Sequence, residues 1–271
     1  MKLWYQSLSR LAEWGGRYPT ALREILARVK DPGTDIHVAG ITGAGGFGDQ
    51  YRYPEFLGTG EVLTNVHQAV REGYDAILIG NIADPGIYEA REIADIPVLG
   101  LSESAMHIAC MMGARFGFVT INEKFTPRVV ENVRRYGLMD RFAGAHRMQV
   151  DRLTDLRSGF EPGEGQDRIL AQFNAAARKC CDNGAEVVIA GGGVVMAMLA
   201  YAGIHQTEDG APILNGIANL VKLGEAAVKM NRIMGGGFTS KKCVYAPPPP
   251  DQIVAFRKYY GADIYPTVET P

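Results

Sequence analysis

The chain has 271 residues, 46% of them apolar, and a formal net charge of −2. This composition is typical of a globular protein with one large domain or two smaller lobes, and the nearly balanced charge argues against nucleic acid or a membrane surface as a partner. No apolar run reaches the roughly 18 residues that a membrane helix needs, and the first residues do not resemble a signal peptide. The four cysteines have no CxxC spacing, so we expect a cytoplasmic protein with reduced thiols.

Short apolar runs alternate with longer amphipathic stretches through the first half of the chain. The apolar runs predict strands at residues 2–8, 35–41, 75–80, 96–101 and 115–121. The stretches between them predict helices at residues 17–30, 58–73, 84–94, 102–113 and 123–137. Asp84 and Pro85 are expected to cap and start the helix at 84–94. The glycine- and aromatic-rich residues 43–56 are expected to form a long loop, either a lid over a ligand or a contact with another subunit.

The second half repeats the same alternation. Strands are expected at residues 144–150 and 185–191, and a short one at the start of 211–233. Helices are expected at residues 166–184, at 194–203 and over the remainder of 211–233. The polar residues 153–165 predict a surface loop, and the proline-rich residues 246–271 predict a tail that runs over the surface.

The alternation of strands and helices predicts an α/β fold with parallel sheets that helices cover on both sides. The stretches GYDAILIGNIADPG (73–86) and GAEVVIAGGGVVMA (184–197) share a small turn, an acidic residue, an apolar strand and a break at polar or glycine residues. This repeat predicts two equivalent lobes whose strand ends face each other, and ligands of parallel sheets bind at such carboxyl ends. The first lobe is assigned to residues 1–100 plus 214–271, with a C-terminal helix and tail, and the second to 101–213.

Four stretches carry a resemblance to a known family: EGYDAILIGNIADPGIYEAREIADIPVLGLSESAMHIACMMGARFGFVT, GAEVVIAGGG, PILNGIANLVKLGEAAV and TSKKCVYAPP. Over residues 35–250 the chain resembles the aspartate/glutamate/hydantoin racemase superfamily, and within it the hydantoin racemase branch. The resemblance implies two Rossmann-like lobes related by pseudo-two-fold symmetry, with the active site in the cleft between them. It also implies a homo-oligomer and chemistry without a cofactor. In such enzymes one thiol per lobe removes or returns a proton on opposite faces of the substrate.

The chain departs from this pattern at both thiol positions. The resemblance would put the first thiol at Asn81 and the second at Gly192. An asparagine only donates or accepts hydrogen bonds and a glycine has no side chain, so two-thiol racemisation is not expected. The cysteines at 110, 180, 181 and 243 fall at neither position. We expect altered chemistry instead, such as hydrolysis, decarboxylation or a different isomerisation.

Several residues at predicted strand ends are candidates for substrate contacts. Asn81 is expected to hold the substrate, or else to form a turn. The glycines before the helix at 194–203 offer backbone N–H groups to a carboxylate or imide oxygen. Further candidates each have a competing structural role as a helix cap or a subunit contact. The candidate substrate-binding residues are Gln6, Ser7, Arg52, Tyr53, Thr120, Gly191, Gly192, Gly193 and Asn215.

Proton transfer without thiols needs another group. Glu103 is the best general-base candidate by its place after a strand, although a glutamate there also suits the first turn of a helix. His107 is four residues later, so the two form either an acid–base pair or a hydrogen-bonded structural pair. Asn81, Glu103 and His107 are therefore the predicted catalytic residues. The other histidines lack the spacing of metal ligands, and we expect no metal.

The sequence thus predicts a cofactor-independent enzyme that acts on a small cyclic amide or carboxylate. Its partner is a small-molecule substrate, with no nucleic acid and no membrane. Two alternatives remain open: a binding protein that kept the cleft and lost catalysis, and a racemase that uses a different acid and base.

Overall fold

The computed structural model describes residues 1–12, 16–43, 45, 50–266 and 268. In this part of the chain the strands form two parallel sheets of four. The first sheet has the order β2-β1-β3-β4, from β1 (Lys2–Gln6), β2 (Asp35–Ala39), β3 (Ala76–Ile79) and β4 (Val98–Gly100). The second has the order β6-β5-β7-β8, from β5 (Phe116–Thr120), β6 (Phe142–Arg147), β7 (Val187–Gly191) and β8 (Ile213–Leu214). The two orders are equivalent strand for strand, so the predicted α/β class with two parallel-sheet lobes is confirmed.

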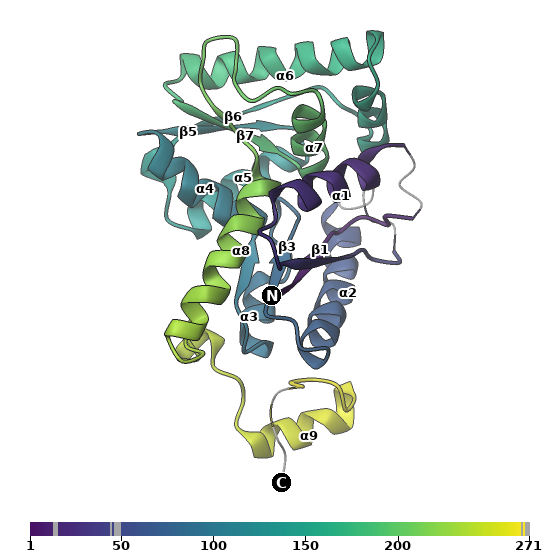
Figure 1. The fold of residues 1–271 in the computed structure, drawn as a ribbon, viewed down its shortest axis with the longest axis vertical. Helices are drawn as coiled ribbons and strands as arrows, with labels where there is room; N and C mark the ends of the chain where they lie inside the picture. Colours follow the sequence, from purple (N-terminus) through teal and green to yellow (C-terminus); the bar gives the residue numbers. More distant parts are fainter. Residues whose placement is uncertain (13–15, 44, 46–49, 267, 269–271) are drawn as a thin grey trace.

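Helices connect the strands and cover both sheets (Figure 1). The α-helices are α1 (Tyr18–Val29), α2 (Arg52–Arg71), α3 (Ile87–Ile93), α4 (Leu101–Met112), α5 (Phe125–Arg135), α6 (Glu164–Asp182), α7 (Gly193–Tyr201), α8 (Gly216–Ile233) and α9 (Pro250–Tyr260). Short 3₁₀ helices are η1 (Met139–Arg141), η2 (Leu153–Phe160) and η3 (Cys243–Tyr245). No helix in the described residues is long and apolar enough to span a membrane.

The alternation of side chains along the strands divides the apolar core. Trp4, Ile77 and Ile79 pack with residues of α2 and α3 on one face of the first sheet. Leu3 and Leu78 point to the other face and join a larger core that includes α1, α8 and the second sheet. Because every residue of β3, β5 and β7 is buried, their apolar runs have the continuous form typical of parallel strands covered on both faces.

The helix α8 links the two sheets. It follows β8 of the second sheet and packs against β3, β4, α1 and α4 (Figure 1). We therefore propose lobe boundaries near residues 100 and 213, with α8 and the tail assigned to the first lobe. The large shared core between α1, α8 and the second sheet keeps the strand ends of both lobes close together.

Three segments differ from the sequence-based expectation. Helix α2 begins at Arg52 rather than at residue 58, so the second part of the expected loop is helical; residues 44 and 46–49 of that loop lie outside the described residues. The predicted surface loop at 153–165 contains η2, whose Leu156 and Phe160 side chains are buried. The tail contains α9, which begins at the prolines with Pro250 in its first turn. Glycine and proline suggested breaks here, but apolar packing and the tolerance of first turns for proline override them.

The role expected for Asp84 is also corrected. Its carboxylate does not cap α3, which begins at Ile87 after Gly86 in a left-handed conformation with φ of 69°. The carboxylate instead accepts the N–H groups of Ser102 and Glu103 in the first turn of α4, at 2.9 and 2.8 Å. An acidic side chain at an N-terminus stabilises the helix, and this one comes from a different turn of the chain.

Candidate active site

A narrow cavity lies where the carboxyl ends of the two sheets face each other. Residues that follow β1, β3, β5 and β7 form most of its walls, and α1, α5 and η2 close the remainder. The lining residues are Ser7, Leu8, Ser9, Tyr18, Gly80, Asn81, Ile82, Ile121, Phe125, Leu153, Gly192, Gly193 and Val194. The cavity has a volume of about 30 Å³, enough for one or two water molecules. This volume is too small for a ring-sized ligand.

Asn81 lies at the mouth of β3 and lines this cavity. Its side-chain oxygen accepts the N–H of Ala83 at 2.9 Å, which is the turn-forming interaction expected of an asparagine after a strand. The carboxamide oxygen thus takes part in the turn. Both interpretations of Asn81 from the sequence are compatible with this geometry.

Gly192 and Gly193 occupy the equivalent position after β7. Gly192 is the N-cap of α7, which has no side-chain cap and no acidic residue in its first turn. The first N–H groups of such a helix lack partners within the helix and carry partial positive charge. Since these residues line the cavity, their N–H groups are suited to hold a carbonyl or carboxylate oxygen.

The space beside Gly192 is already occupied. A Cβ added to Gly192 would lie 2.7 Å from Cδ1 of Ile121 and 3.4 Å from its Cγ1. The position at which the resemblance would put the second thiol therefore has no side chain, and the apolar side chain of Ile121, directly after β5, fills the space beside it. A side chain at position 192 would therefore require Ile121 to move.

Two tyrosines near the cavity were not identified from the sequence. Tyr18 lines the cavity and is buried, and a Cβ on Gly193 would lie 3.5 Å from its hydroxyl oxygen. Tyr5 lies beneath Gly80, where an added Cβ would be 2.4 Å from the Tyr5 hydroxyl oxygen. Burial, with a contribution from Tyr18, raises the pKa of Tyr5 well above its usual range. Tyr18 lies in the stretch predicted to form the helix at residues 17–30, and no local signal distinguishes it.

The predicted residues around β1 and β5 divide into lining and supporting groups. Ser7 lines the cavity, and its hydroxyl oxygen accepts the N–H of Ser9 at 3.1 Å. Gln6 is buried behind it and donates to the carbonyls of Ser7 and Gly40, at 2.9 and 3.3 Å. Thr120 is buried and shares a 2.6 Å hydrogen bond with the hydroxyl of Thr126. Gln6 and Thr120 thus brace the strand ends that shape the cavity.

Two further predicted residues lie at element boundaries. Asn215 caps α8: its side-chain oxygen accepts the N–H groups of Ile217 and Ala218, each at 3.1 Å. Of the two roles considered for it, the structure shows the helix cap. Gly191 is the last residue of β7 and directly precedes the glycines that line the cavity.

The structure does not bring Glu103 and His107 to this cavity. The Glu103 carboxylate forms an ion pair with Arg91, and both side chains are mostly buried. His107 is exposed, and its Nδ1 lies 2.8 Å from the backbone oxygen of Glu103 rather than near the carboxylate. The expected acid–base pair of side chains does not form, because Arg91 holds the carboxylate.

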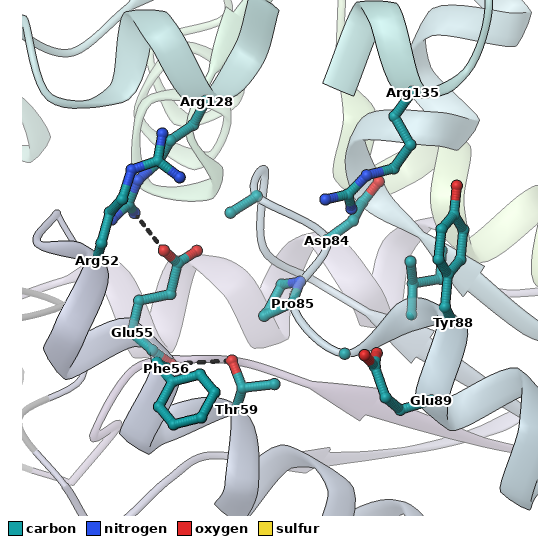
Figure 2. Close-up of a pocket in the computed structure, with 13 residues that line it drawn as sticks. Arg52, Glu55, Phe56, Thr59, Asp84, Pro85, Tyr88, Glu89, Arg128 and Arg135 are labelled. Atoms are coloured by element: carbon teal, nitrogen blue, oxygen red, sulfur yellow. Dashed lines mark hydrogen bonds and ion pairs between the residues drawn. The ribbon is translucent and has the colours of Figure 1, made fainter. Parts of the chain in front are cut away.

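Arg52 and Tyr53 belong to the first turn of α2. Tyr53 is 71% exposed. Arg52 forms an ion pair with Glu131 of α5 at 2.5 Å. It lines a second cavity, together with residues 83–89 and with Arg128 and Arg135 of α5 (Figure 2). No group of three or more histidine, cysteine, aspartate or glutamate residues within the described ranges is placed to hold a metal ion.

Two equivalent parallel sheets with a small cavity between their facing strand ends define a two-lobed α/β protein with a candidate ligand site between the lobes. Residues 22–224 match the model of the Asp/Glu/Hydantoin racemase family. The chain belongs to this family.

Individual relatives agree with this assignment. The hydantoin racemase of Pseudomonas sp. (strain NS671) is 29% identical over 209 residues, which cover 77% of this chain and 78% of that protein. The hydantoin racemase of Rhizobium meliloti is 28% identical over 190 residues, covering 69% and 72%. The allantoin racemase structure from Klebsiella pneumoniae superposes with a TM-score of 0.70 at 23% identity, covering 92% of this chain and 94% of that one. At this identity the superposition supports the fold alone.

Proposed function

We propose that this protein is a cofactor-independent enzyme that stabilises a carbanion next to a carbonyl group of a small cyclic amide or carboxylate. The relatives named hydantoin racemases act on a substrate class of this kind, a small ring with carbonyl groups beside an acidic carbon. The supporting observation is the pairing of Asn81 with the N-terminus of α7 across one cavity.

The N-terminus of α7 supplies the electrostatic part of the proposal. A substrate carbonyl oxygen would accept the first N–H groups of the helix, which stabilise the negative charge as the carbanion delocalises into an enolate. The side chains of Asn81 and Ser7, which line the same cavity, would hold the other polar edge of the substrate. These groups bind and polarise, and none of them removes a proton from carbon.

The ionisable side chain that lines the cavity at Asn81 is better suited to donate a proton to the substrate than to remove one. Of the described residues that line the cavity, Tyr18 alone carries an ionisable side chain, and a phenol is a proton donor at neutral pH. A racemase needs a base at its first step, whereas a decarboxylase does not. When the C–C bond to a carboxylate breaks, CO₂ leaves, its electron pair remains as the enolate, and a proton then adds to carbon. Decarboxylation of a carboxylate next to a carbonyl is therefore the leading reaction of this proposal.

The test is a proton NMR time course in D₂O with hydantoins, cyclic imides, amino acids and substituted malonates. Loss of CO₂ from a malonate with deuterium at the resulting carbon would support the proposal, and Tyr18→Phe should then slow the reaction. Exchange of α-protons without bond cleavage would instead establish a racemase with a different acid and base, the second candidate that the relatives favour. Ring opening would indicate a hydrolase. Silence across the panel would refute the enzymatic proposal and leave a binding protein.

A further inference from the structure

We propose that Tyr5 is a further substrate-binding residue of the cavity at Asn81, and that its buried hydroxyl donates a hydrogen bond to a carbonyl or carboxylate oxygen of the bound substrate. Tyr5 belongs to β1 and is completely buried. It can act in this way only if the cavity at Asn81 is the substrate site, so this proposal rests on the proposed function.

The Tyr5 hydroxyl is a polar group without a partner. Its oxygen is buried and forms no hydrogen bond with any residue in the part of the chain that the structure describes. Buried hydroxyl groups are normally hydrogen-bonded, because an unpaired one destabilises the fold. Burial, with a contribution from the nearby Tyr18, raises the pKa of Tyr5 well above its usual range, so the hydroxyl keeps its proton at neutral pH. A buried donor of this kind is suited to an acceptor atom that arrives with a ligand.

The Tyr5 side chain leans toward the end of the first sheet at which the cavity lies. In the parallel register Tyr5 pairs with Leu78 of β3. The tip of its ring nevertheless reaches Gly80, two residues further along the chain, where an added Cβ would lie 2.3 Å from Cζ and 2.4 Å from the hydroxyl oxygen of Tyr5. Gly80 lines the cavity. A ring-sized substrate must widen this cavity of about 30 Å³, and Gly80 has no side chain to keep it from the hydroxyl.

The second lobe shows that packing at this place does not require a hydroxyl. Phe118 of β5 pairs with Ile189 of β7, as Tyr5 pairs with Leu78 of β3. The two strand pairs hold equivalent places in their sheets, and Phe118 is also completely buried. A phenyl ring thus fills the equivalent place without a polar group, so the hydroxyl of Tyr5 has a use other than packing, and Tyr5→Phe should fold.

The experiment is NMR of the full chain with tyrosine isotope-labelled at Cζ, whose chemical shift responds to hydrogen bonding at the hydroxyl. The variants Tyr5→Phe and Tyr18→Phe assign the two signals, and the probes are a 5-substituted hydantoin and a substituted malonate. Binding should shift both signals, and Tyr5→Phe should weaken binding of the probe by about tenfold, since it removes a hydrogen bond to the ligand. Tyr259→Phe is the matched control: it removes the same atom from a side chain of α9 that is 84% exposed, and it should leave the affinity unchanged.

The outcomes distinguish this role of Tyr5 from the proposed function. Tyr5→Phe should not lower the melting temperature, and a clear decrease would reveal a partner within the chain and overturn the role. A probe that shifts the Tyr18 signal but not that of Tyr5, or that binds Tyr5→Phe as tightly as the native chain, would overturn it and leave the proposed function intact. Shifts of both signals without turnover of any substrate would support the role and refute the proposed reaction. If no probe shifts either signal, the cavity does not bind this substrate class and both proposals fail.

Discussion

Introducing a thiol at each strand end should give this chain proton exchange at carbon, provided that Ile121 is shortened at the same time. Asn81 and Gly192 follow equivalent strands and line the same cavity, so the geometry for two facing groups exists. The obstacle is steric, because the Cβ introduced by Gly192→Cys would lie 2.7 Å from Cδ1 of Ile121. Ile121→Val removes that atom and keeps Cγ1, which is at an acceptable 3.4 Å.

The expected gain follows from the chemistry of positioned proton carriers. One general acid or base typically contributes about 10²–10⁴-fold in rate, and the native chain has no thiol at either position. The thiol introduced by Gly192→Cys would also be at the N-terminus of α7, which favours the reactive thiolate. We expect the variant Asn81→Cys/Gly192→Cys/Ile121→Val to exchange the α-proton of a 5-substituted hydantoin at least about 10²-fold faster than the native chain. Ile121→Val itself should reduce stability by only about 0.5–1.5 kcal/mol.

The assay is deuterium incorporation at the hydantoin α-carbon, followed by NMR. The matched control, Asn81→Ser/Gly192→Ser/Ile121→Val, has nearly the same shape without the thiols and should show no gain. The variant that retains Ile121 should be slower than the one with valine. If the thiol variant folds and binds a hydantoin yet exchanges no faster than its serine control, the two positions do not face one substrate and the reasoning fails.

Three further predictions concern stability. Burial raises the pKa of Asp84 from 3.8 to about 7. The protonated Asp84 side chain therefore stabilises the fold fully below pH 3.8, and this stabilisation is lost as the pH rises through about 7. Asp84→Asn should flatten this part of the pH dependence of the free energy of unfolding, measured in urea. Lys241 donates to three backbone carbonyls at the end of α3, at 2.6 to 3.0 Å, so Lys241→Met should lower the free energy of unfolding by about 1.5–3 kcal/mol and speed proteolysis of the tail. Asn215→Ala should reduce stability by about 1 kcal/mol through loss of the α8 cap.

Each of these has its own check. For Asp84, an unchanged pH profile in the asparagine variant would assign the titration to another group. For Lys241, Lys242→Met is the control, because that exposed neighbour makes no such contacts, and equal effects of the two variants would contradict the argument. For Asn215, Asn215→Ser retains an N-cap and should recover most of the loss; if it does not, the side chain has a role besides capping.

Lys241 joins the segment after α8 to the end of α3. Its ammonium group lies at the C-terminus of α3, where the backbone carbonyls lack partners within the helix. Tyr265 adds a 2.7 Å hydrogen bond to Glu92 of α3. Both contacts join residues more than 140 positions apart, so a reading of local composition could not reveal them.

Much of the architecture could be read from the sequence because it depends on local pattern. The runs AILI, FGFVT and VVIAG are apolar throughout, and parallel strands buried on both faces require this. The repeat around Asn81 and Gly192 correctly indicated two equivalent sheets, since β3 and β7 hold the same place in their strand orders. The predictions were wrong where packing outweighed the local preference of glycine and polar residues for loops, as at the start of α2 and in η2.

The sequence by itself determined the strands, the parallel sheets and the strand ends that carry polar or glycine residues, because burial imposes a periodicity that each segment records independently. Only the tertiary structure decided which side chains meet. Asn81, Gly192 and Tyr18 line one cavity, and Ile121 fills the space beside Gly192. Glu103 is paired with Arg91 and does not line this cavity. These choices depend on packing between segments far apart in the chain, and no local pattern encodes such distances.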